Sequence, residues 1–339
     1  MSDLQRAVET VVGPCLGVQA GEDVVIVVDR TTRVLGDALR DAAAALGAEP
    51  VMTVMEPRSV DGEEPPAAVA AALGAARVFI APTRRSLSHT RARKAASEAG
   101  ARGATLPGVT EDMLARLMAT DFPAMAARSR AVAELLTEAD TACVTCPRGS
   151  DFTADLSGRS GIADDGDLTA EGAFGNLPCG EGFISPLSGE GTLIAATLAS
   201  LGLADEPVRL VVRDGRLAEA SGEWGARWAA LMDAAGASDA EDRGAAQAGG
   251  EASGRGRKPA GRGSGRNLAE LGVGTNERAT LTGNILEDEK MLGTVHVAFG
   301  ASAGIGGTVS VPVHLDCLIE DATLDVGGTR VLDAGRFVL

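Results

Sequence analysis

The sequence predicts an α/β protein in which an N-terminal parallel α/β layer is followed by a mixed α+β domain. Apolar runs of strand type alternate with alanine- and leucine-rich runs of helix type as far as residue 140, as is typical of a parallel sheet. Beyond residue 140, short strand-like segments, glycines and turn residues replace the helical pattern. Because 339 residues suffice for two domains of ordinary size, we expect one domain at residues 1–140 and another at 141–339.

The elements expected in the first domain alternate between strand and helix. Residues 23–29 form a continuous apolar run of buried-strand type, and an alanine-rich helix at 31–46 is ended by Gly47. Strands that are separated by helices pair in parallel. The other elements that we expect are strands at 49–55 and 77–81, and helices at 67–73, 90–99, from residue 110, and at 122–139.

The first domain has no phosphate-binding loop. Asp29-Arg-Thr-Thr follows the first strand, where a dinucleotide-binding protein has a Gly-x-Gly pattern. We therefore expect this domain to be a scaffold and a cover for substrate, with no nucleotide cofactor. His89 and Arg93 could face the substrate from this domain, although we favour a structural role for both.

Two features organise the second domain before residue 267. Residues 207–220 predict a hairpin, because Asp214-Gly215 between two apolar runs is a strong turn signal. Residues 237–265 consist mainly of alanine, glycine, serine and arginine, without apolar periodicity. Such a composition cannot bury enough apolar surface to offset the entropy of ordering, so we expect a flexible insertion at about 237–265.

Net charge limits the classes of partner. The chain carries a formal charge of -16 and has a pI near 4.7, whereas nucleic acids and anionic membranes bind basic surfaces. No N-terminal segment has the features of a signal peptide, and no apolar run reaches the roughly 18 residues that spanning a bilayer requires. We therefore expect a cytoplasmic protein that binds neither nucleic acid nor membrane.

The cysteines predict thiols rather than a disulfide framework. Their number, five, is odd and small for 339 residues. Cys143 and Cys146 form a Cys-x-x-Cys pattern that a redox or zinc site could use, but no second pair follows it. Structural thiols are the interpretation that we favour.

The strongest chemical signal is the placement of two of the three histidines. In residues 309–316, apolar residues alternate with His314 and Asp316, so a strand there places both polar side chains on one face. A second strand at 293–300 offers His296 in the same way, and glycines between the strands allow a tight connection. Imidazole and carboxylate together predict a divalent-metal site, although polar residues on half-exposed strands would show the same pattern.

Two further charged residues are candidates for this site. Glu181 lies between two glycines in a loop that enters a strand, where an ordinary exposed glutamate is the alternative. Lys290 follows Asp288 and Glu289. It could form an ion pair with a carboxylate near the metal, or it could lie at the surface.

Five motifs occur in the order found in one metallopeptidase family. These are Asn176-Leu-Pro-Cys-Gly-Glu181, Ala269-Glu270-Leu-Gly-Val-Gly-Thr-Asn276, Asp288-Glu-Lys290, Gly293-Thr-Val-His296-Val-Ala-Phe-Gly300 and His314-Leu-Asp316. The chain from residue 151 onward resembles the thermophilic aminopeptidases, of the aminopeptidase T and aminopeptidase S type, in their shorter leucyl-aminopeptidase-like branch. His89-Thr-Arg-Ala-Arg93 also resembles that branch.

The resemblance implies a metallo-aminopeptidase. Its metal ligands fall on Glu181, Glu270, His296, His314 and Asp316, which would hold two divalent ions of zinc, cobalt or manganese. The resemblance further implies hydrolysis of peptides or small molecules by a metal-activated water, with Glu181 or Glu270 as the general base, and a homodimer.

One departure from the family keeps other functions open. Peptidases of this family have a tyrosine a few residues after the Gly-Thr-x-His motif, at about Ala303 here, and the chain contains no tyrosine. The first alternative is a mononuclear iron enzyme of the 2,5-dihydroxypyridine dioxygenase type, which resembles this chain in His-x-Asp but has a histidine at the position of Glu270. The second alternative is a metal-binding protein of this family without peptidase turnover.

Overall fold

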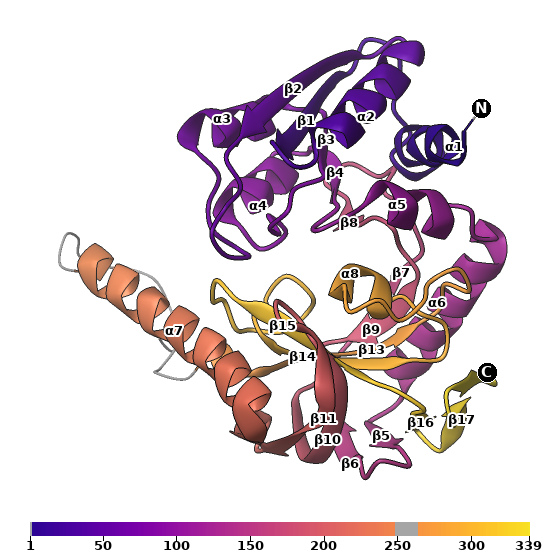
Figure 1. Ribbon diagram of the computed structural model, residues 1–339, viewed down its shortest axis with the longest axis vertical. Coiled ribbons are helices and arrows are strands. Elements are labelled where there is room, and N and C mark those ends of the chain that lie inside the picture. The colour runs from indigo at the N-terminus through magenta and orange to yellow at the C-terminus, as the bar shows by residue number, and fades with distance from the viewer. Residues whose placement is uncertain (1, 248–263) are drawn as a thin grey trace. The chain divides into compact units, whose positions relative to one another are not determined.

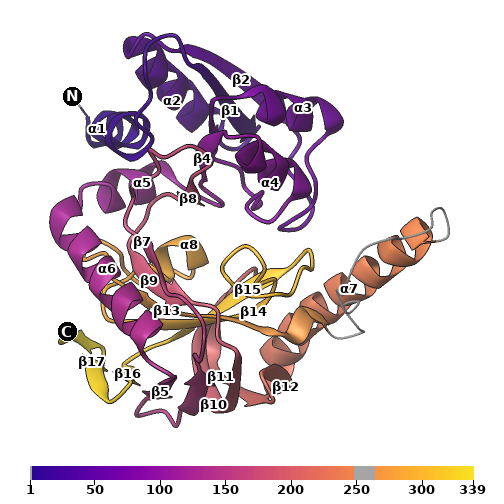
Figure 2. The same ribbon diagram turned by 180° about the vertical axis from the view of Figure 1, so that it is seen from behind.

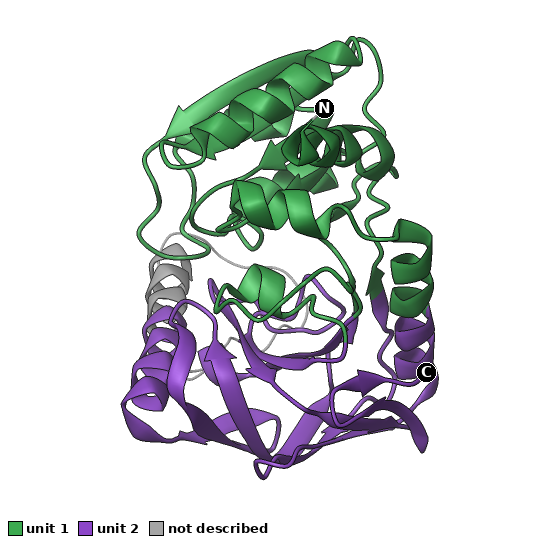
Figure 3. Ribbon diagram, turned by 45° about the vertical axis from the view of Figure 1, so that its right-hand side comes forward, with its two compact units in different colours: residues 1–130, 163–181, 275–292 green, residues 131–162, 182–274, 293–339 purple. Residues whose placement is uncertain are grey.

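The computed structural model describes residues 2–247 and 264–339, and Figure 1 labels their helices and strands. The chain forms two compact units, coloured separately in Figure 3. Unit 1 comprises residues 1–130, 163–181 and 275–292, and unit 2 comprises residues 131–162, 182–274 and 293–339. Neither unit is one continuous stretch of sequence, whereas the expected domains at 1–140 and 141–339 follow the chain. That division into domains stays a prediction.

Unit 1 contains a parallel sheet of five strands in the order β2-β1-β3-β4-β8. Each neighbouring pair is parallel, and β1 pairs with β2 along its whole length. The strands are β1 (Asp23–Asp29), β2 (Glu49–Met55), β3 (Val78–Ala81), β4 (Arg102–Thr105) and β8 (Phe174–Asn176). The predicted α/β fold class with its N-terminal parallel layer is confirmed.

Several helices of unit 1 begin directly after a residue whose side chain caps them. Ser2, Thr90 and Thr110 each accept a hydrogen bond from a backbone N–H of the first turn, which satisfies one of its unpaired donors. The helices are α1 (Asp3–Thr10), the π-helix η1 (Val11–Cys15), α2 (Arg33–Ala45), α3 (Ala67–Ala75), α4 (Arg91–Glu98), α5 (Glu111–Leu117) and α8 (Ile285–Asp288), and α6 (Phe122–Glu138) continues into unit 2.

Alternate residues of β1 enter two apolar cores on opposite faces of the sheet. Val24, Ile26 and Val28 pack in one core with residues of α1, α2 and α5. Val25 and Val27 pack in the other core with residues of α3 and α4. Helices therefore cover both faces of the sheet, as Figure 2 shows from behind, and this explains why β1 is apolar without alternation.

Unit 2 is built on an antiparallel sheet. The described strands have the order β18-β17-β16-β5-β6-β10-β15-β14-β13-β9-β7, with β11 joined to β10 and β12 joined to β11. They are β5 (Thr141–Thr145), β6 (Asp151–Asp155), β7 (Ile162–Asp164), β9 (Glu181–Ile184), β10 (Ser188–Leu198), β11 (Gly202–Arg213), β12 (Arg216–Ala220), β13 (Leu268–Gly274), β14 (Val295–Gly300), β15 (His314–Ile319), β16 (Thr323–Val326), β17 (Thr329–Asp333) and β18 (Arg336–Phe337).

The predicted hairpin is present as β11 and β12. Asp214 and Gly215 connect the two strands with φ angles of 50° and 65°, the left-handed pair that a two-residue hairpin turn requires. A short 3-10 helix, η2 (Ser264–Arg266), precedes β13.

Two expected elements differ from the structure. Residues 237–247, which we expected to be part of a flexible insertion, are the last turns of helix α7 (Gly222–Gln247), since alanine and charged residues favour a helix even without an apolar stripe. The rest of that prediction falls mainly on residues 248–263, outside the described residues. The strand expected at 309–316 begins only at His314, because Pro312 has no N–H to donate to a ladder.

None of the helices within residues 2–247 and 264–339 has both the length and the apolar character needed to cross a membrane.

An ion pair at the amino end of the parallel sheet gives a prediction about pH. Arg102 donates to both carboxylate oxygens of Glu22, over 2.9 and 2.6 Å, and these hydrogen bonds hold the pKa of Glu22 below its ordinary value. A carboxylate with a lowered pKa stabilises the fold above its unfolded-state pKa of about 4.3, and this stability is lost as the pH falls through the folded-state pKa. We expect Glu22→Gln to lower the free energy of unfolding by about 1–3 kcal/mol at pH 7. The difference should shrink toward about pH 3, as urea denaturation at several pH values will measure.

Glu219→Gln is the control, because Glu219 is half exposed and pairs with Arg213 at the surface. It should change the stability by less than about 1 kcal/mol at either pH. A Glu22→Gln variant as stable as the wild type at pH 7 would contradict the role of the pair.

Candidate metal centre

Three neighbouring strands of unit 2 carry four of the candidate ligands on one face. Residues that lie directly opposite each other in an antiparallel ladder have their side chains on the same face. Glu270 of β13 pairs with Ala298 of β14, and Ala298 pairs with Asp316 of β15. His296 and His314 lie two residues from Ala298 and Asp316, so they share this face. The strands expected around both histidines are therefore present, with their polar residues on one side.

A β-bulge decides the direction of Glu270. Leu268 pairs with Phe299, but Glu270 pairs with Ala298, so one extra residue, Ala269, is accommodated in β13. In a regular ladder without a bulge, Ala269 would pair with Ala298, and Glu270 would lie opposite Val297 on the apolar face. The bulge thus turns the carboxylate toward the histidines.

Small residues form the floor beneath these side chains. Ala298 lies between Glu270 and Asp316 in the cross-strand row. Gly272 lies opposite His296, and a Cβ atom added to Gly272 would collide with the Nε2 and Cε1 atoms of the His296 ring. The imidazole therefore lies across the backbone of β13 at a position that only glycine allows.

Glu270 occupies the centre of the cluster. Its Oε1 is 3.3 Å from His296 Nε2, and its Oε2 is 3.2 Å from His314 Nε2. Asp316 Oδ1 is 3.6 Å from the same His314 nitrogen. His314 Nδ1 lies 2.8 Å from the carbonyl oxygen of Ala301, which fixes Nδ1 as the protonated nitrogen and turns Nε2 toward the carboxylates.

Glu181 reaches the cluster as the first residue of β9, the strand beside β13 in the sheet. Two groups of residues then have the composition of a metal site, and within each group the donor atoms all lie within 4.8 Å of one another. One group is Glu181, Glu270 and His296, and the other is Glu270, His314 and Asp316. Glu270 belongs to both groups.

The pKa of His314 is shifted by its neighbours. Burial by itself lowers it, but the negative charges of Asp316 and Glu270, and the hydrogen bonds with both, raise it well above its ordinary value. The two carboxylates therefore favour the protonated form of the His314 imidazole, and a divalent ion would compete with that proton.

A buried lysine orients Glu181 from within unit 1. Lys290 is fully buried, and its Nζ lies 2.5 Å from Glu181 Oε1, 2.9 Å from Glu289 Oε1 and 3.4 Å from Asp164 Oδ2. Burial alone lowers the pKa of Lys290, but these three carboxylates raise it well above its ordinary value. Burial raises the pKa of Asp164 to about 7, against the attraction of Lys290 and with the help of the negative charge of Glu181.

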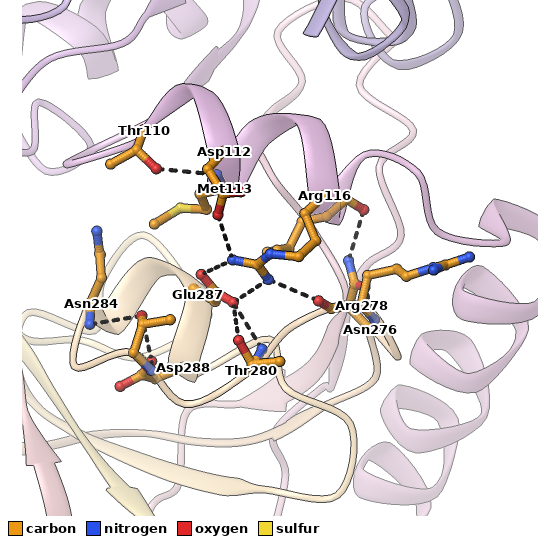
Figure 4. Close-up of polar contacts among 12 residues, drawn as sticks. Thr110, Asp112, Met113, Arg116, Asn276, Arg278, Thr280, Asn284, Glu287 and Asp288 are labelled. Atoms are coloured by element: carbon orange, nitrogen blue, oxygen red, sulfur yellow. Dashed lines mark hydrogen bonds and ion pairs between the residues drawn. The ribbon is translucent and has the colours of Figure 1, made fainter. Parts of the chain in front are cut away.

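The segment that carries Lys290 is anchored to α5 by a second buried carboxylate. Figure 4 shows Arg116 of α5 donating to both oxygens of Glu287, over 2.5 and 2.9 Å, and to the carbonyl oxygen of Arg278. Thr280 donates to Glu287 as well. Asn284 caps α8 and donates to the carbonyl oxygen of Gly108. These bonds fix the short helix directly before Lys290.

All five residues suggested by the motifs come together in the structure. Their role as metal ligands stays a prediction, because no comparison tests it. Four residues that shape the site are not evident as such from the sequence: Asp164, Gly272, Glu289 and Ala298. Asp164 and Glu289 lie in acidic runs that look like solvated surface, and the importance of Gly272 and Ala298 depends on strand pairing that motifs do not reveal.

The remaining candidates lie outside these two groups. Cys317 follows Asp316 in β15 and points to the opposite face, where burial raises the pKa of its thiol. Cys143 is exposed and Cys146 half-buried, and both are free thiols. His89 is half-buried before α4, and Arg93 is buried in its first turn.

This fold and site define an α/β protein with a candidate centre for a divalent metal ion. A family model described as 2,5-dihydroxypyridine 5,6-dioxygenase matches residues 3–248, which is more than half of the chain. The chain therefore belongs to the 2,5-dihydroxypyridine 5,6-dioxygenase family. The matched range includes Glu181 and ends before the other four candidate ligands. Comparison with curated protein sequences found no match.

Two solved structures share the fold. The 2,5-dihydroxypyridine dioxygenase from Pseudomonas putida KT2440 is similar over 100% of this chain and 98% of its own, with a TM-score of 0.77 and 19% identity. Wild-type AmpT from Thermus thermophilus is similar over 99% of each chain, with a TM-score of 0.66 and 19% identity. At this level of identity, both likenesses show the fold alone.

The expectation of a metallo-aminopeptidase is wrong. The family match identifies a dioxygenase family, which comprises oxidoreductases rather than hydrolases or proteases, and the dioxygenase structure has the same fold. The likeness to AmpT confirms the aminopeptidase-like fold that the motifs indicated. The motifs thus identified an architecture that different chemistries share, and the reaction does not follow from the architecture.

Lys290 gives a prediction about stability. Lys290→Met fills similar space but leaves Glu181, Glu289 and Asp164 without their buried cation. We expect the free energy of unfolding to fall by about 3–5 kcal/mol, because uncompensated buried charges are costly. Chemical denaturation will measure it, with Lys94→Met, which removes a less buried lysine, as the control. Equal losses in both variants would contradict the role given to Lys290.

Ala298 gives a prediction about metal binding. Ala298→Val places two methyl groups between Glu270 and Asp316 on the ligand face. We expect zinc binding, measured by titration calorimetry, to weaken by at least about tenfold, as when groups around a metal are displaced.

Val297→Ile adds bulk to the opposite face of the same strand. This variant should lower the free energy of unfolding and leave zinc affinity unchanged. If the two variants weaken zinc binding equally, the metal does not lie above Ala298.

Proposed function

We propose that this protein is a metal-dependent dioxygenase that opens the ring of a hydroxylated nitrogen heteroaromatic compound. Membership of the 2,5-dihydroxypyridine 5,6-dioxygenase family is the observation that carries the proposal. The cluster of imidazole and carboxylate groups supports it, because oxygen and nitrogen donors without thiolate suit ferrous iron. The family description gives the substrate class, a dihydroxypyridine.

Glu270, His314 and Asp316 are the residues that would hold the iron. Their donor atoms lie within 4.8 Å of one another on one face of the sheet. One imidazole and two carboxylates differ from the common triad of two histidines and one carboxylate, but they likewise leave coordination positions for other ligands. A ferrous ion held there would supply the redox chemistry that lets dioxygen react with the hydroxylated ring, and the ring itself would provide the electrons that reduce dioxygen. The hydrogen bond from His314 Nδ1 to Ala301 holds the imidazole in the orientation for this task.

We propose one metal ion rather than two. The two groups share Glu270, so a second ion would have to be bridged to the first. The carboxylate of Glu181 already has the Lys290 ammonium 2.5 Å from its Oε1. This ammonium supplies part of the positive charge that a second ion would bring to that side of the cluster. Iron therefore takes the place of the zinc, cobalt or manganese pair suggested by the motifs.

Glu181 is the residue that we propose as proton acceptor. A hydroxylated ring becomes more electron-rich when its hydroxyl group loses a proton, and a carboxylate in the site can take that proton. Glu270 has an imidazole beside each of its oxygens, which leaves it less suited to this role. Glu181 is held in place by Lys290 and is only slightly exposed.

The proposal is tested by oxygen uptake. Protein loaded anaerobically with ferrous iron should consume about one dioxygen per 2,5-dihydroxypyridine, followed with an oxygen electrode and by the loss of the ring's ultraviolet absorbance. Asp316→Asn should lower iron affinity and uptake rate by at least about 100-fold, since losing even an outer partner of a ligand costs about 10- to 100-fold.

Asp205→Asn is the matched control, because Asp205 is exposed on β11. It should bind one iron and take up oxygen like the wild type. A chain that binds iron but consumes no oxygen with any hydroxylated pyridine would refute the proposed reaction, and two irons per chain would refute the single-ion site.

A further inference from the structure

Arg93 is a buried cation that is held rigidly within unit 1. Its side chain is only 8% exposed, and its Nε donates to the carbonyl oxygen of Ser88 over 2.7 Å. The guanidinium carbon lies 3.9 Å from the centre of the Phe174 ring, which itself stacks on Phe79 at 6.3 Å. Backbone and aromatic contacts therefore fix the plane of the guanidinium group.

Arg93 has no counter-ion among residues 2–247 and 264–339. Glu98, an exposed residue of the same helix, is the acid whose charge acts on it, and it forms no ion pair with Arg93. Burial lowers the pKa of Arg93 to about 10. A buried charge is normally paired, because its loss of hydration costs folding free energy. This cost indicates that something other than the described residues neutralises the guanidinium group.

The outer nitrogens of Arg93 remain open to a ligand. In the described part of the chain neither Nη atom forms a hydrogen bond, and neither belongs to the fully buried polar atoms. Nε and one face of the group are used by Ser88 and Phe174, so the edge with the two Nη atoms is the part that can bind. That edge is a planar fork of N–H donors, which matches the two oxygens of a carboxylate.

Asn176 provides a second donor on the same strand as Phe174. Its Oδ1 accepts a hydrogen bond from Thr105 Oγ1 over 2.7 Å, and Ser88 Oγ lies 3.3 Å from it. These bonds fix the orientation of the amide, and its Nδ2 forms no hydrogen bond with a described residue. Phe174 and Asn176 are two positions apart in β8 and lie on one face of the strand.

We propose that Arg93 and Asn176 form a binding site for the carboxylate group of a small organic acid. The site lies where β4 and β8 end, at Thr105 and Asn176, and ligands of open parallel sheets bind at the carboxyl ends of the strands. Asn176 is five residues before Glu181, so the two residues are at most about 18 Å apart. A carboxylate bound by Asn176 therefore lies in the same region of unit 1 as Glu181, the candidate proton acceptor.

The experiment measures benzoate binding to the full chain as purified, by titration calorimetry or ligand-observed NMR. Arg93→Gln should weaken benzoate binding by at least about tenfold, the factor that a hydrogen bond to a charged group supplies. Benzamide, which has the same ring without the charge, should bind at least about tenfold more weakly than benzoate to the wild type. Acetate tests the carboxylate group without the ring. Tighter binding of benzoate than of acetate indicates that the site takes an aromatic acid, and equal binding indicates that it takes any small carboxylate.

Three variants show where on the protein benzoate binds. Arg91→Gln, an exposed arginine of the same helix paired with Glu64, should leave benzoate binding unchanged. Asn176→Ala is the second test if Arg93→Gln does not fold, and it should also weaken binding. Asp316→Asn alters the candidate metal centre and should leave benzoate binding unchanged, so failure of the dioxygenase proposal does not affect this test.

Two results would overturn the carboxylate site. One is benzoate affinity that is the same in the wild type, Arg93→Gln and Asn176→Ala. The other is loss of benzoate binding in Asp316→Asn, because the carboxylate would then be bound by the metal centre.

Discussion

The pairing of β13, β14 and β15 is the constraint on which the candidate centre depends. In this centre, imidazoles and carboxylates that are far apart in the sequence come together because they leave one face of one sheet at neighbouring positions. The bulge at Ala269 meets this condition for Glu270, because a register without it would turn the carboxylate into the apolar face. Ala298 and Gly272 then leave the space that larger side chains would fill. Local backbone geometry and small residues thus matter as much as the ligands themselves.

A second constraint is electrostatic. Glu181, Glu289 and Asp164 are buried acids in one small region of unit 1, and their mutual repulsion would be severe without Lys290. The lysine reduces this repulsion and fixes the carboxylate that begins β9. In our proposal, the same ammonium supplies beside Glu181 part of the positive charge that a second metal ion would bring.

The motifs predicted a hydrolase because they are defined by residues that bind metal, and such residues do not specify the reaction. A carboxylate, an imidazole and a His-x-Asp strand serve an ion that activates water or an ion that activates dioxygen equally well. The absent tyrosine was the one sequence feature that weighed against a peptidase, and the family match of residues 3–248 decided the class. The aminopeptidase-like part of the prediction survives as shared architecture.

Four features could be predicted from the residues alone: the α/β class, the first strand with the helices around it, the hairpin at Asp214-Gly215, and the same-face placement of His314 and Asp316. These follow from local periodicity and turn chemistry, which act over a few residues. The sequence did not determine that residues 237–247 are helical, that a bulge redirects Glu270, or that Asp164, Glu289 and Lys290 meet in the interior. The bulge and the buried charges could be seen only in the folded chain, because they depend on which distant segments pair and on how far charged groups are removed from water. The burial of Arg93 is a feature of the same kind. The sequence shows an arginine, and only the packed chain shows that it is buried with no acid beside it among the residues that the structure describes.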